Sequence, residues 1–209
     1  YDPAFDRVYF RGGNNLYYAK YSNSLGGWQV FQTVVDNVAY DITDDDVTVR
    51  SDIGKIFYRG TDNRLWQYGC CNGIGQWHKI PVNVLADVAG AVTYKKVDNK
   101  DRVYYKDFSN NLKYWEYDSG WKNKIVENNN VTNEIVTCDD NFSSVFYTGN
   151  DNRFYSFGWK NDLSPKPLIG SDDLSLKKSF DFSLTNERLY FIDGTKKIRY
   201  YQWQNTDSN

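Results

Sequence analysis

Apolar and polar residues alternate in short runs along this chain, and the stretch from 46 to 82 shows the alternation most clearly. Four runs lie there, at 46–52, 54–60, 64–69 and 76–82. Alternation with a period of two is typical of a strand that buries one of its faces. The turn residues between the second and third runs, Asp62 and Asn63, tolerate the left-handed backbone that a tight hairpin requires. The pattern therefore predicts four short strands joined by turns.

The strand–turn–strand phrase at the centre of this stretch recurs five times. It reads VYFRGGNNLYY from Val8, IFYRGTDNRLW from Ile56, VYYKDFSNNLKYW from Val103, VFYTGNDNRFY from Val145 and LYFIDGTKKIRYY from Leu189. Successive starts are 42–48 residues apart. A period in the forties indicates an array of similar supersecondary units, which we number one to five. Such arrays usually function through sites that are replicated from unit to unit.

A glycine followed by a tryptophan opens the fourth strand in three of the units. The segments are Gly26-Gly27-Trp28, Gly75-Gln76-Trp77 and Gly120-Trp121. Unit four has Leu163-Ser-Pro-Lys-Pro instead, and its two prolines predict an irregular edge. Unit five has no fourth strand after its run at 198–203.

No segment shows the apolar period of an amphipathic helix over three turns, so we expect an all-β protein. Four-stranded units repeated radially form a β-propeller, and five of them form a five-bladed disc. We expect one domain over 1–209, with repeat cores at about 8–36, 46–83, 91–127, 134–170 and 178–203. Residues 1–6 are too short for a confident first strand, so the terminal blade is expected to close by borrowing a strand from the other end. More blades are expected outside the chain if it is a piece of a larger protein.

The composition supports this fold and excludes some partners. Aromatic residues make up 18% of the chain, and they favour the half-buried, pleated surface of a sheet. The net charge is −2, with 25 basic and 27 acidic residues well mixed, which argues against nucleic acid as a partner. No apolar run approaches the roughly 18–20 residues that span a bilayer. The chain begins at Tyr1 and contains no methionine, so we expect a processed or excised form.

The cysteines and sequons carry no clear function. The chain has three cysteines, Cys70, Cys71 and Cys138. Because the number is odd, they cannot all form disulfides within the chain. Cys70 and Cys71 could form a strained vicinal disulfide or be free thiols on strands. Nothing has the spacing of metal ligands, and we expect neither a metal nor a cofactor. Sequons begin at Asn130 and Asn141, and they matter only if the host glycosylates the protein.

Enzymatic function has weak support. His78 is the only histidine, and it lies on a predicted outer strand. The acidic run at 44–46 fits a solvated turn better than a calcium loop, because it lacks the ligand spacing of a known loop. The stretch from Ser51 to Gly54 differs by one residue from the Ser/Thr-x-Asp-x-Gly-x-x-Trp motif of sialidase-type propellers, which argues against a sialidase. No pair of carboxylates recurs where glycoside hydrolysis would require it. We therefore expect a protein that is not an enzyme.

The repeats resemble those of a known group of lectins. The segments YRGTDNRLWQY (58–68) and GIGQWHKI (73–80) are similar to repeats of tachylectin-like five-bladed lectins and of Photorhabdus-type and fucose-binding propeller lectins. The resemblance extends over residues 8–203. It implies a carbohydrate-binding protein with ligand sites between adjacent blades or at blade rims, one per interface.

Sugar binding requires aromatic faces and polar side chains together, because a pyranose has an apolar C–H face and a ring of hydroxyls. The candidate aromatic residues are Tyr17, Trp28, Trp66, Trp77, Tyr114, Trp115, Trp121 and Tyr155. The candidate polar residues, at the entry to the central turn, are Arg11, Arg59 and Lys106. Thr148 and Ile192 replace them in units four and five, which predicts degenerate sites there.

Each of these residues also has a structural interpretation. Trp28, Trp77 and Trp121 could pack between blades. Arg11 and Arg59 could pair with aspartates of neighbouring blades.

Two functions remain open from the sequence. The first is a secreted or cell-surface lectin whose weak sites act multivalently on glycans or glycoconjugates. The second is a protein–protein interaction propeller within a larger secreted or surface protein. A lectin should preserve its polar contacts blade by blade, whereas a protein interface should concentrate on one face. The divergence of units four and five keeps the second alternative open.

Overall fold

The secondary structure is entirely β within the part of the chain that the computed structural model describes. That part comprises residues 7–33, 35–39, 47–50, 55–70, 77–82, 85–98, 100–137, 145–151, 153–158, 166–167, 180–183, 188–192 and 197–202. It contains the strands β1 to β17 and no helix, which confirms the all-β prediction there. Accordingly, these residues include no helix of the length and hydrophobicity needed to cross a membrane.

Each of the five phrases forms an antiparallel hairpin. The pairs are β1 (Arg7–Gly12) with β2 (Asn15–Ser22), β5 (Lys55–Arg59) with β6 (Leu65–Cys70), β9 (Lys100–Asp107) with β10 (Asn111–Tyr117), β12 (Val145–Gly149) with β13 (Phe154–Phe157), and β16 (Arg188–Ile192) with β17 (Ile198–Gln202). Asn63 and Asn110 have φ angles of 59° and 63° at equivalent turn positions. Asparagine adopts this left-handed conformation at low cost, so the local sequence determines where the chain reverses.

Unit two has the four strands that the sequence predicts. β4 (Val47–Arg50) and β7 (Trp77–Pro81) flank the central hairpin, and the order in the sheet is β4-β5-β6-β7. Units one and five have three strands each: β3 (Gly27–Gln32) completes the first sheet, and β15 (Phe180–Ser183) precedes the hairpin of the last.

Units three and four share one long strand. β8 (Val88–Val97) and β11 (Trp121–Thr137) flank the hairpin of unit three. β11 then continues and pairs with β12, so that β8–β14 form one seven-stranded sheet. The register of β11 shifts on both sides of this passage, which lets a single strand serve two units. The outer strand of unit four, β14 (Lys166–Pro167), has only two residues, at the position where the prolines predict an irregular edge.

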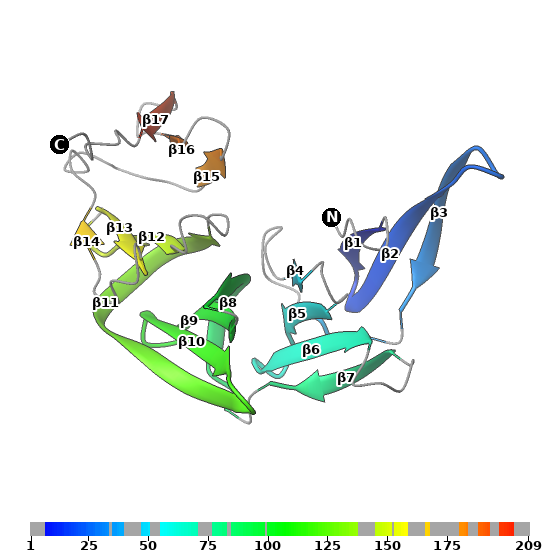
Figure 1. The fold of residues 1–209 in the computed structure, drawn as a ribbon, viewed down its shortest axis with the longest axis horizontal. Coiled ribbons are helices and arrows are strands. Elements are labelled where there is room, and N and C mark those ends of the chain that lie inside the picture. The colour runs from blue at the N-terminus through cyan, green and yellow to red at the C-terminus, as the bar shows by residue number, and fades with distance from the viewer. Residues whose placement is uncertain are drawn as a thin grey trace.

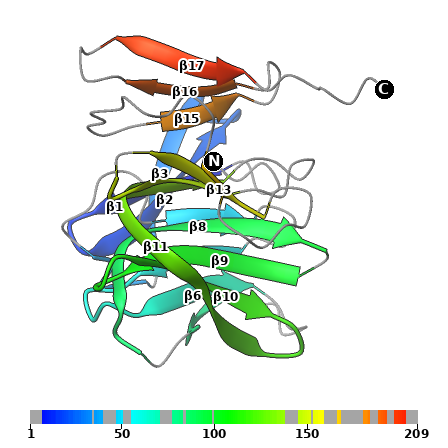
Figure 2. The ribbon, with the colours of Figure 1, turned by 90° about the vertical axis from the view of Figure 1, so that its left-hand side faces the viewer.

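The five hairpin units follow one another along an open arc (Figure 1). The sheet of β1–β3 lies at one end of this arc and the sheet of β15–β17 at the other, and the two do not meet. The side view shows β15–β17 as a separate layer beyond β13 (Figure 2). The units are therefore arranged in the manner of propeller blades, but the ring is not closed.

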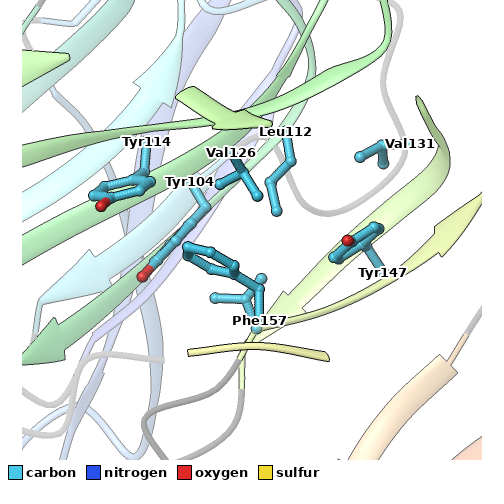
Figure 3. Packing of buried hydrophobic residues seen from close by; sticks show 8 residues of the cluster. Tyr104, Leu112, Tyr114, Val126, Val131, Tyr147 and Phe157 are labelled. Carbon is cyan, nitrogen blue, oxygen red and sulfur yellow. The ribbon is translucent and has the colours of Figure 1, made fainter. Parts of the chain in front are cut away.

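Consecutive units pack face to face through aromatic and aliphatic side chains. We call the face of a unit that points to the following unit its front face, and the opposite one its rear face. Tyr104, Leu112 and Tyr114 form the front face of unit three, and they contact Tyr147 and Phe157 on the rear face of unit four (Figure 3). Alternation along each strand supplies both faces, because neighbouring side chains point to opposite sides of a sheet.

The same contact recurs at the two preceding interfaces. Unit one presents Tyr9 and Leu16 to Ile56, Tyr58 and Tyr68 of unit two. Unit two presents Phe57 and Leu65 to a rear face of unit three that includes Val103, Tyr105 and Trp115. The core of the molecule is thus a series of similar interfaces between sheets.

Backbone hydrogen bonds connect the turns of units one, two and three to the unit that follows. The amide nitrogens of Val38, Val88 and Val131 donate to the carbonyl oxygens of Asn14, Asn63 and Asn110 at 3.0, 3.0 and 2.6 Å. Each acceptor is in a hairpin turn, and each donor lies about 20–25 residues further along the chain. The turns of units one, two and three are therefore anchored at the junctions between units.

Several features of the sequence lie outside the described residues. They are the acidic run at 44–46, the stretch from Ser51 to Gly54, Cys71, Cys138 and the sequon at Asn141. His78 and Asn130 are placed as backbone positions of β7 and β11. Among the described residues no three His, Cys, Asp or Glu side chains are grouped as a metal site would require.

Candidate functional site

The central turn of unit two combines an acid, an arginine and an indole. One carboxylate oxygen of Asp62, Oδ1, accepts hydrogen bonds from the backbone nitrogen of Arg64 at 3.1 Å and from Nε1 of Trp66 at 3.0 Å. The other oxygen lies 3.9 Å from Nε of Arg64. The carboxylate therefore fixes both the turn and the orientation of the indole ring.

Unit four repeats this arrangement with a tyrosine. Asp151 Oδ1 accepts from the backbone nitrogen of Arg153 at 3.1 Å, and Oδ2 accepts from the Tyr155 hydroxyl at 2.7 Å. Nε of Arg153 lies 3.9 Å from Oδ2 of Asp151, as in unit two. We call these two groups, Asp62/Arg64/Trp66 and Asp151/Arg153/Tyr155, the turn clusters.

A glycine beneath each aromatic ring makes the turn clusters possible. A Cβ atom added to Gly60 would lie 2.7 Å from Nε1 of Trp66 and even closer to Oδ1 of Asp62. A Cβ atom at Gly149 would lie 2.7 Å from the Tyr155 ring and 2.8 Å from Oδ1 of Asp151. Neither glycine has a positive φ, so the requirement for glycine here is the close approach of the ring.

We expect Gly60→Ala to lower the free energy of unfolding by about 1–3 kcal/mol, because overpacking displaces the Trp66 ring and breaks its bond to Asp62. Urea unfolding followed by circular dichroism measures this loss. Gly27→Ala is the matched control, because a Cβ atom there meets nothing within 4 Å. Equal stability of the two variants would contradict the close contact at Gly60.

Both turn clusters are accessible to a ligand. The side chains of Asp62, Arg64, Asp151 and Arg153 are between 40% and 47% exposed. The aromatic rings are half-buried and rest on the glycines. Burial, followed by the hydrogen bond to Asp151, raises the pKa of the Tyr155 phenol above its ordinary value, so it remains a hydrogen-bond donor at neutral pH.

Unit one has only part of this arrangement. Tyr17 lies over Gly12, where an added Cβ atom would approach the ring to 2.8 Å. Tyr17 also stacks on Phe10 with centroids 5.7 Å apart, as Tyr155 stacks on Tyr147 at 5.5 Å. However, only four residues separate Arg11 from Leu16, whereas five separate Arg59 from Leu65 at the equivalent positions of unit two, and none of the four is acidic.

The candidate arginines contact the backbone of the following unit. Arg59 Nη1 donates to the carbonyl oxygen of Ala89 at 3.3 Å, and Arg11 Nη1 donates to that of Ala39. Lys106, at the equivalent position of unit three, is half-buried. These contacts connect consecutive units, so Arg11 and Arg59 have a structural role whether or not they also meet a ligand.

The candidate tryptophans outside the turns differ in their surroundings. Trp121 lies edge-on to Phe57 of the preceding unit with centroids 5.7 Å apart, and Trp115 packs against the same cluster. Trp28 is largely exposed and meets Tyr21 edge-on at 5.7 Å. Tyr114 is buried on the front face of unit three. Trp77 begins β7, and its side chain is outside the description.

One repeated contact is absent from the candidates that the sequence analysis identified. An arginine lies over a tyrosine ring of the neighbouring strand in units one, three and five: Arg7 over Tyr18 at 4.4 Å, Arg102 over Tyr114 at 5.3 Å and Arg188 over Tyr200 at 4.3 Å. In all three units the arginine stands directly before the repeated phrase, so alignment of the flanking residues could have revealed it.

The arginine of unit three is engaged differently from the other two. Arg102 Nε donates to Oε2 of Glu116 at 2.7 Å, and both side chains are buried. The residues opposite Arg7 and Arg188 are Lys20 and Gln202, which supply no carboxylate. Nη1 of Arg7 instead donates to the Tyr9 hydroxyl at 3.5 Å.

Comparison with known proteins identifies relatives by structure alone. No protein-family model matches the sequence, and no curated protein matches it. The structure of the SapL1 lectin in complex with alpha methyl fucoside matches 96% of this chain and 74% of its own, with a TM-score of 0.55 and 17% identity. AofleA from Arthrobotrys oligospora matches 95% of this chain and 65% of its own, with a TM-score of 0.60 and 13% identity.

The Dos1 propeller matches the whole of this chain and 58% of its own, with a TM-score of 0.58 and 9% identity. The chain therefore spans only about three fifths to three quarters of the length of these proteins. At such low identity the likeness shows a shared propeller-type fold. It leaves the tachylectin-like and Photorhabdus-type resemblance, the blade count and the sugar sites as predictions.

Proposed function

We propose that this protein is a lectin that binds carbohydrates at its turn clusters. The observation that carries the proposal is the recurrence of one combination, an acid, an arginine and an aromatic ring over a glycine, at the half-exposed turns of units two and four. The fold alone explains the glycine, which makes room for the ring, and the acid, which holds the turn and the ring in place. It does not explain the exposed arginine. The SapL1 lectin, which shares the fold, is in complex with a methyl fucoside.

The chemistry of the turn clusters suits a neutral pyranose. The ring of Trp66 or Tyr155 offers a flat surface to the apolar C–H face of the sugar. The carboxylate oxygens accept hydrogen bonds from sugar hydroxyls, and the guanidinium of Arg64 or Arg153 donates to hydroxyl and ring oxygens. Because Asp62 already holds the indole of Trp66, little side-chain freedom is lost when a sugar binds.

Multivalency raises the strength of binding to surfaces that display many sugars. Two sites on one rigid chain convert the second binding event into an intramolecular one, which increases avidity by roughly 10²–10⁴. Glycoconjugates outside the cell or on its surface are the partners that such a protein would meet. We propose a binding role without catalysis, because each turn cluster contains one carboxylate and glycoside hydrolysis requires two.

A glycan array probed with the purified protein tests the function, and titration of intrinsic tryptophan fluorescence with methyl α-fucoside follows. We expect saturable binding to one class of sugars, with a fluorescence change from Trp66. A blank array with protein that unfolds cooperatively would rule out the lectin proposal. It would favour the alternative of a protein-interaction domain, to be sought by pull-down.

We also propose that the five units close into a ring. The rear face of unit one is exposed, with Trp28 at 54% and Val30 at 61%, whereas Ile56, Val103 and Val145 on other rear faces are fully buried. The front face of unit five is exposed as well, with Ile198 at 76%, whereas its equivalents Leu16, Leu65, Leu112 and Phe154 are fully buried. The chain thus has one uncovered face of each kind.

The internal interfaces predict how these two faces would fit. Trp121 lies against Phe57 at the interface of units two and three. The equivalent residues at the ends of the arc are Trp28 and Tyr190. We propose that Trp28 packs on Tyr190 when the arc in Figure 1 tightens, so that β15–β17 cover the rear face of β1–β3.

Replacement of Ile198 by arginine tests ring closure. If the ring closes, a charge at this buried position should lower the free energy of unfolding by roughly 2 kcal/mol or more. Ile125→Arg, at an exposed site of β11, is the matched control and should change it by less than about 0.5 kcal/mol. Equal stability of both variants would show that the faces remain open. A concentration-dependent sedimentation coefficient would instead assign the faces to a second copy of the chain.

A further inference from the structure

Unit three carries a coordinated replacement at the two positions that define a turn cluster. Asp107 stands where units two and four have Gly60 and Gly149, and Lys113 stands where they have Trp66 and Tyr155. The asparagine of the turn keeps its conformation: Asn110 has a φ of 63° and Asn63 one of 59°, and their backbone nitrogens donate to the carbonyl oxygens of Asp107 and Gly60 at 3.0 and 2.9 Å. The turn is therefore retained while its surface chemistry changes from an aromatic ring to an ion pair.

The ion pair occupies the place of the aromatic ring. Nζ of Lys113 lies 2.9 Å from Oδ2 of Asp107 and 3.1 Å from Oδ2 of Asp87. Oδ1 of Asp107 accepts from the backbone nitrogens of Ser109 and Asn111 at 2.9 and 2.8 Å. The ammonium group is thus held between two carboxylates, and the carboxylate of Asp107 is committed to the turn.

The charges of this pair persist across the physiological pH range. Burial alone would raise the pKa of Asp107, but the hydrogen bonds from Asn111 and Lys113 outweigh it and hold the pKa below its ordinary value. Burial alone would lower the pKa of Lys113, but Asp107 and Asp87 outweigh it and raise the pKa. Breaking the pair would leave charges without their partners in a largely buried place, which makes the closed arrangement persistent.

We propose that the turn of unit three is a closed counterpart of the turn clusters, and that the residue pair at these two positions decides which units bind sugar. This inference rests on the proposed lectin function and deepens it. A glycine with an aromatic residue, in a turn that also has the acid and the arginine, gives a binding turn, as in units two and four. An aspartate with a cationic residue gives a turn that presents no ring face and has no free carboxylate.

The sequence of unit five follows the same rule. Asp193 and Arg199 stand at the two deciding positions, so an acid again occurs together with a cation. No unit combines an aspartate with an aromatic residue at these two positions, and no unit combines a glycine with a cationic residue there. Unit one combines Gly12 with Tyr17 but has no turn acid, so it is only part of a site. The inference therefore assigns two complete sugar sites to this chain.

Exchange of the residue pairs between units two and three tests this assignment. The closing variant is Gly60→Asp with Trp66→Lys. The opening variant is Asp107→Gly with Ser109→Asp, Asn111→Arg and Lys113→Trp, which gives unit three the glycine, acid, arginine and indole of unit two. Equilibrium dialysis with labelled methyl α-fucoside counts the bound ligands per chain, and thermal unfolding verifies that each variant is folded.

The expected counts are two for the wild type, one for the closing variant and three for the opening variant. No binding by the wild type would overturn the fucoside-binding function and this inference with it. Two ligands on both the wild type and the folded opening variant would overturn the inference alone. If the opening variant fails to fold, the closing variant decides: an unchanged count of two would show that the pair does not control binding.

Discussion

Replacement of Glu116 by leucine should lower the free energy of unfolding by about 3–5 kcal/mol, because it leaves the Arg102 guanidinium buried without its carboxylate. Nε of Arg102 and Oε2 of Glu116 are 2.7 Å apart, and the two side chains are only 8% and 9% exposed. They face each other across β9 and β10, so the remaining charge would stay at an almost fully buried position. Chemical denaturation of the purified variant measures the change.

The matched control for this variant is Asp118→Leu, at the exposed end of the same strand pair. Asp118 lies 3.5 Å from Lys100 and 3.8 Å from Lys122, but its side chain is half-exposed. Exposed pairs contribute roughly 0–1 kcal/mol, so little stability should be lost. The double variant Arg102→Met with Glu116→Leu should recover most of the loss, because an apolar pair of similar volume replaces a buried ion pair without leaving a charge behind. Similar costs for Glu116→Leu and Asp118→Leu would show that burial does not govern this pair.

The hairpins could be predicted from the sequence because their information is local. In unit two the predicted runs at 54–60 and 64–69 lie within one residue of β5 (Lys55–Arg59) and β6 (Leu65–Cys70). Alternating side chains define the faces, and Asn63 defines the reversal of the chain. Both signals act within ten residues, so no tertiary contact can easily override them.

The connection between units could not be predicted in the same way. The sequence analysis separates a core at 91–127 from one at 134–170, whereas β11 runs through both as a single strand from Trp121 to Thr137. Nothing in the local sequence distinguishes a long strand with two shifts of register from two short strands, because both bury alternate residues. The openness of the arc depends on angles between sheets, and these arise from packing.

The candidate site was visible in part. Trp66 and Tyr155 stood out because an aromatic residue follows each turn, and both belong to turn clusters. The sequence predicts Asp62 only as a turn residue and does not single out Asp151, although each accepts a hydrogen bond from the aromatic side chain of its own turn. Comparing the units position by position would have separated turns that pair a glycine with an aromatic residue from turns that pair an aspartate with a cationic residue.

Removal of both aromatic rings should abolish binding to surfaces that display sugars. We expect Trp66→Ala with Tyr155→Ala to lower avidity for an immobilised glycan by more than the roughly 10²–10⁴ that bivalency contributes, because neither unit can then contribute its stacking surface. Each single variant should keep one site and bind methyl α-fucoside at half the stoichiometry, but it should lose most of the gain from bivalency. Surface plasmon resonance on dense and sparse glycan layers separates these two effects.

The control for stacking is Phe108→Ala, which removes an exposed aromatic ring from the turn of unit three. Unit three presents an ion pair in place of an aromatic ring, so this variant should bind like the wild type. Thermal unfolding distinguishes a lost contact from a lost fold, since Trp66 and Tyr155 also pack at the margin of the core. A loss of cooperative unfolding in Trp66→Ala would assign this indole to the core. Unchanged avidity in a folded double variant would exclude the turn clusters as sugar sites and direct attention to the stacks of Arg7 on Tyr18 and Arg188 on Tyr200.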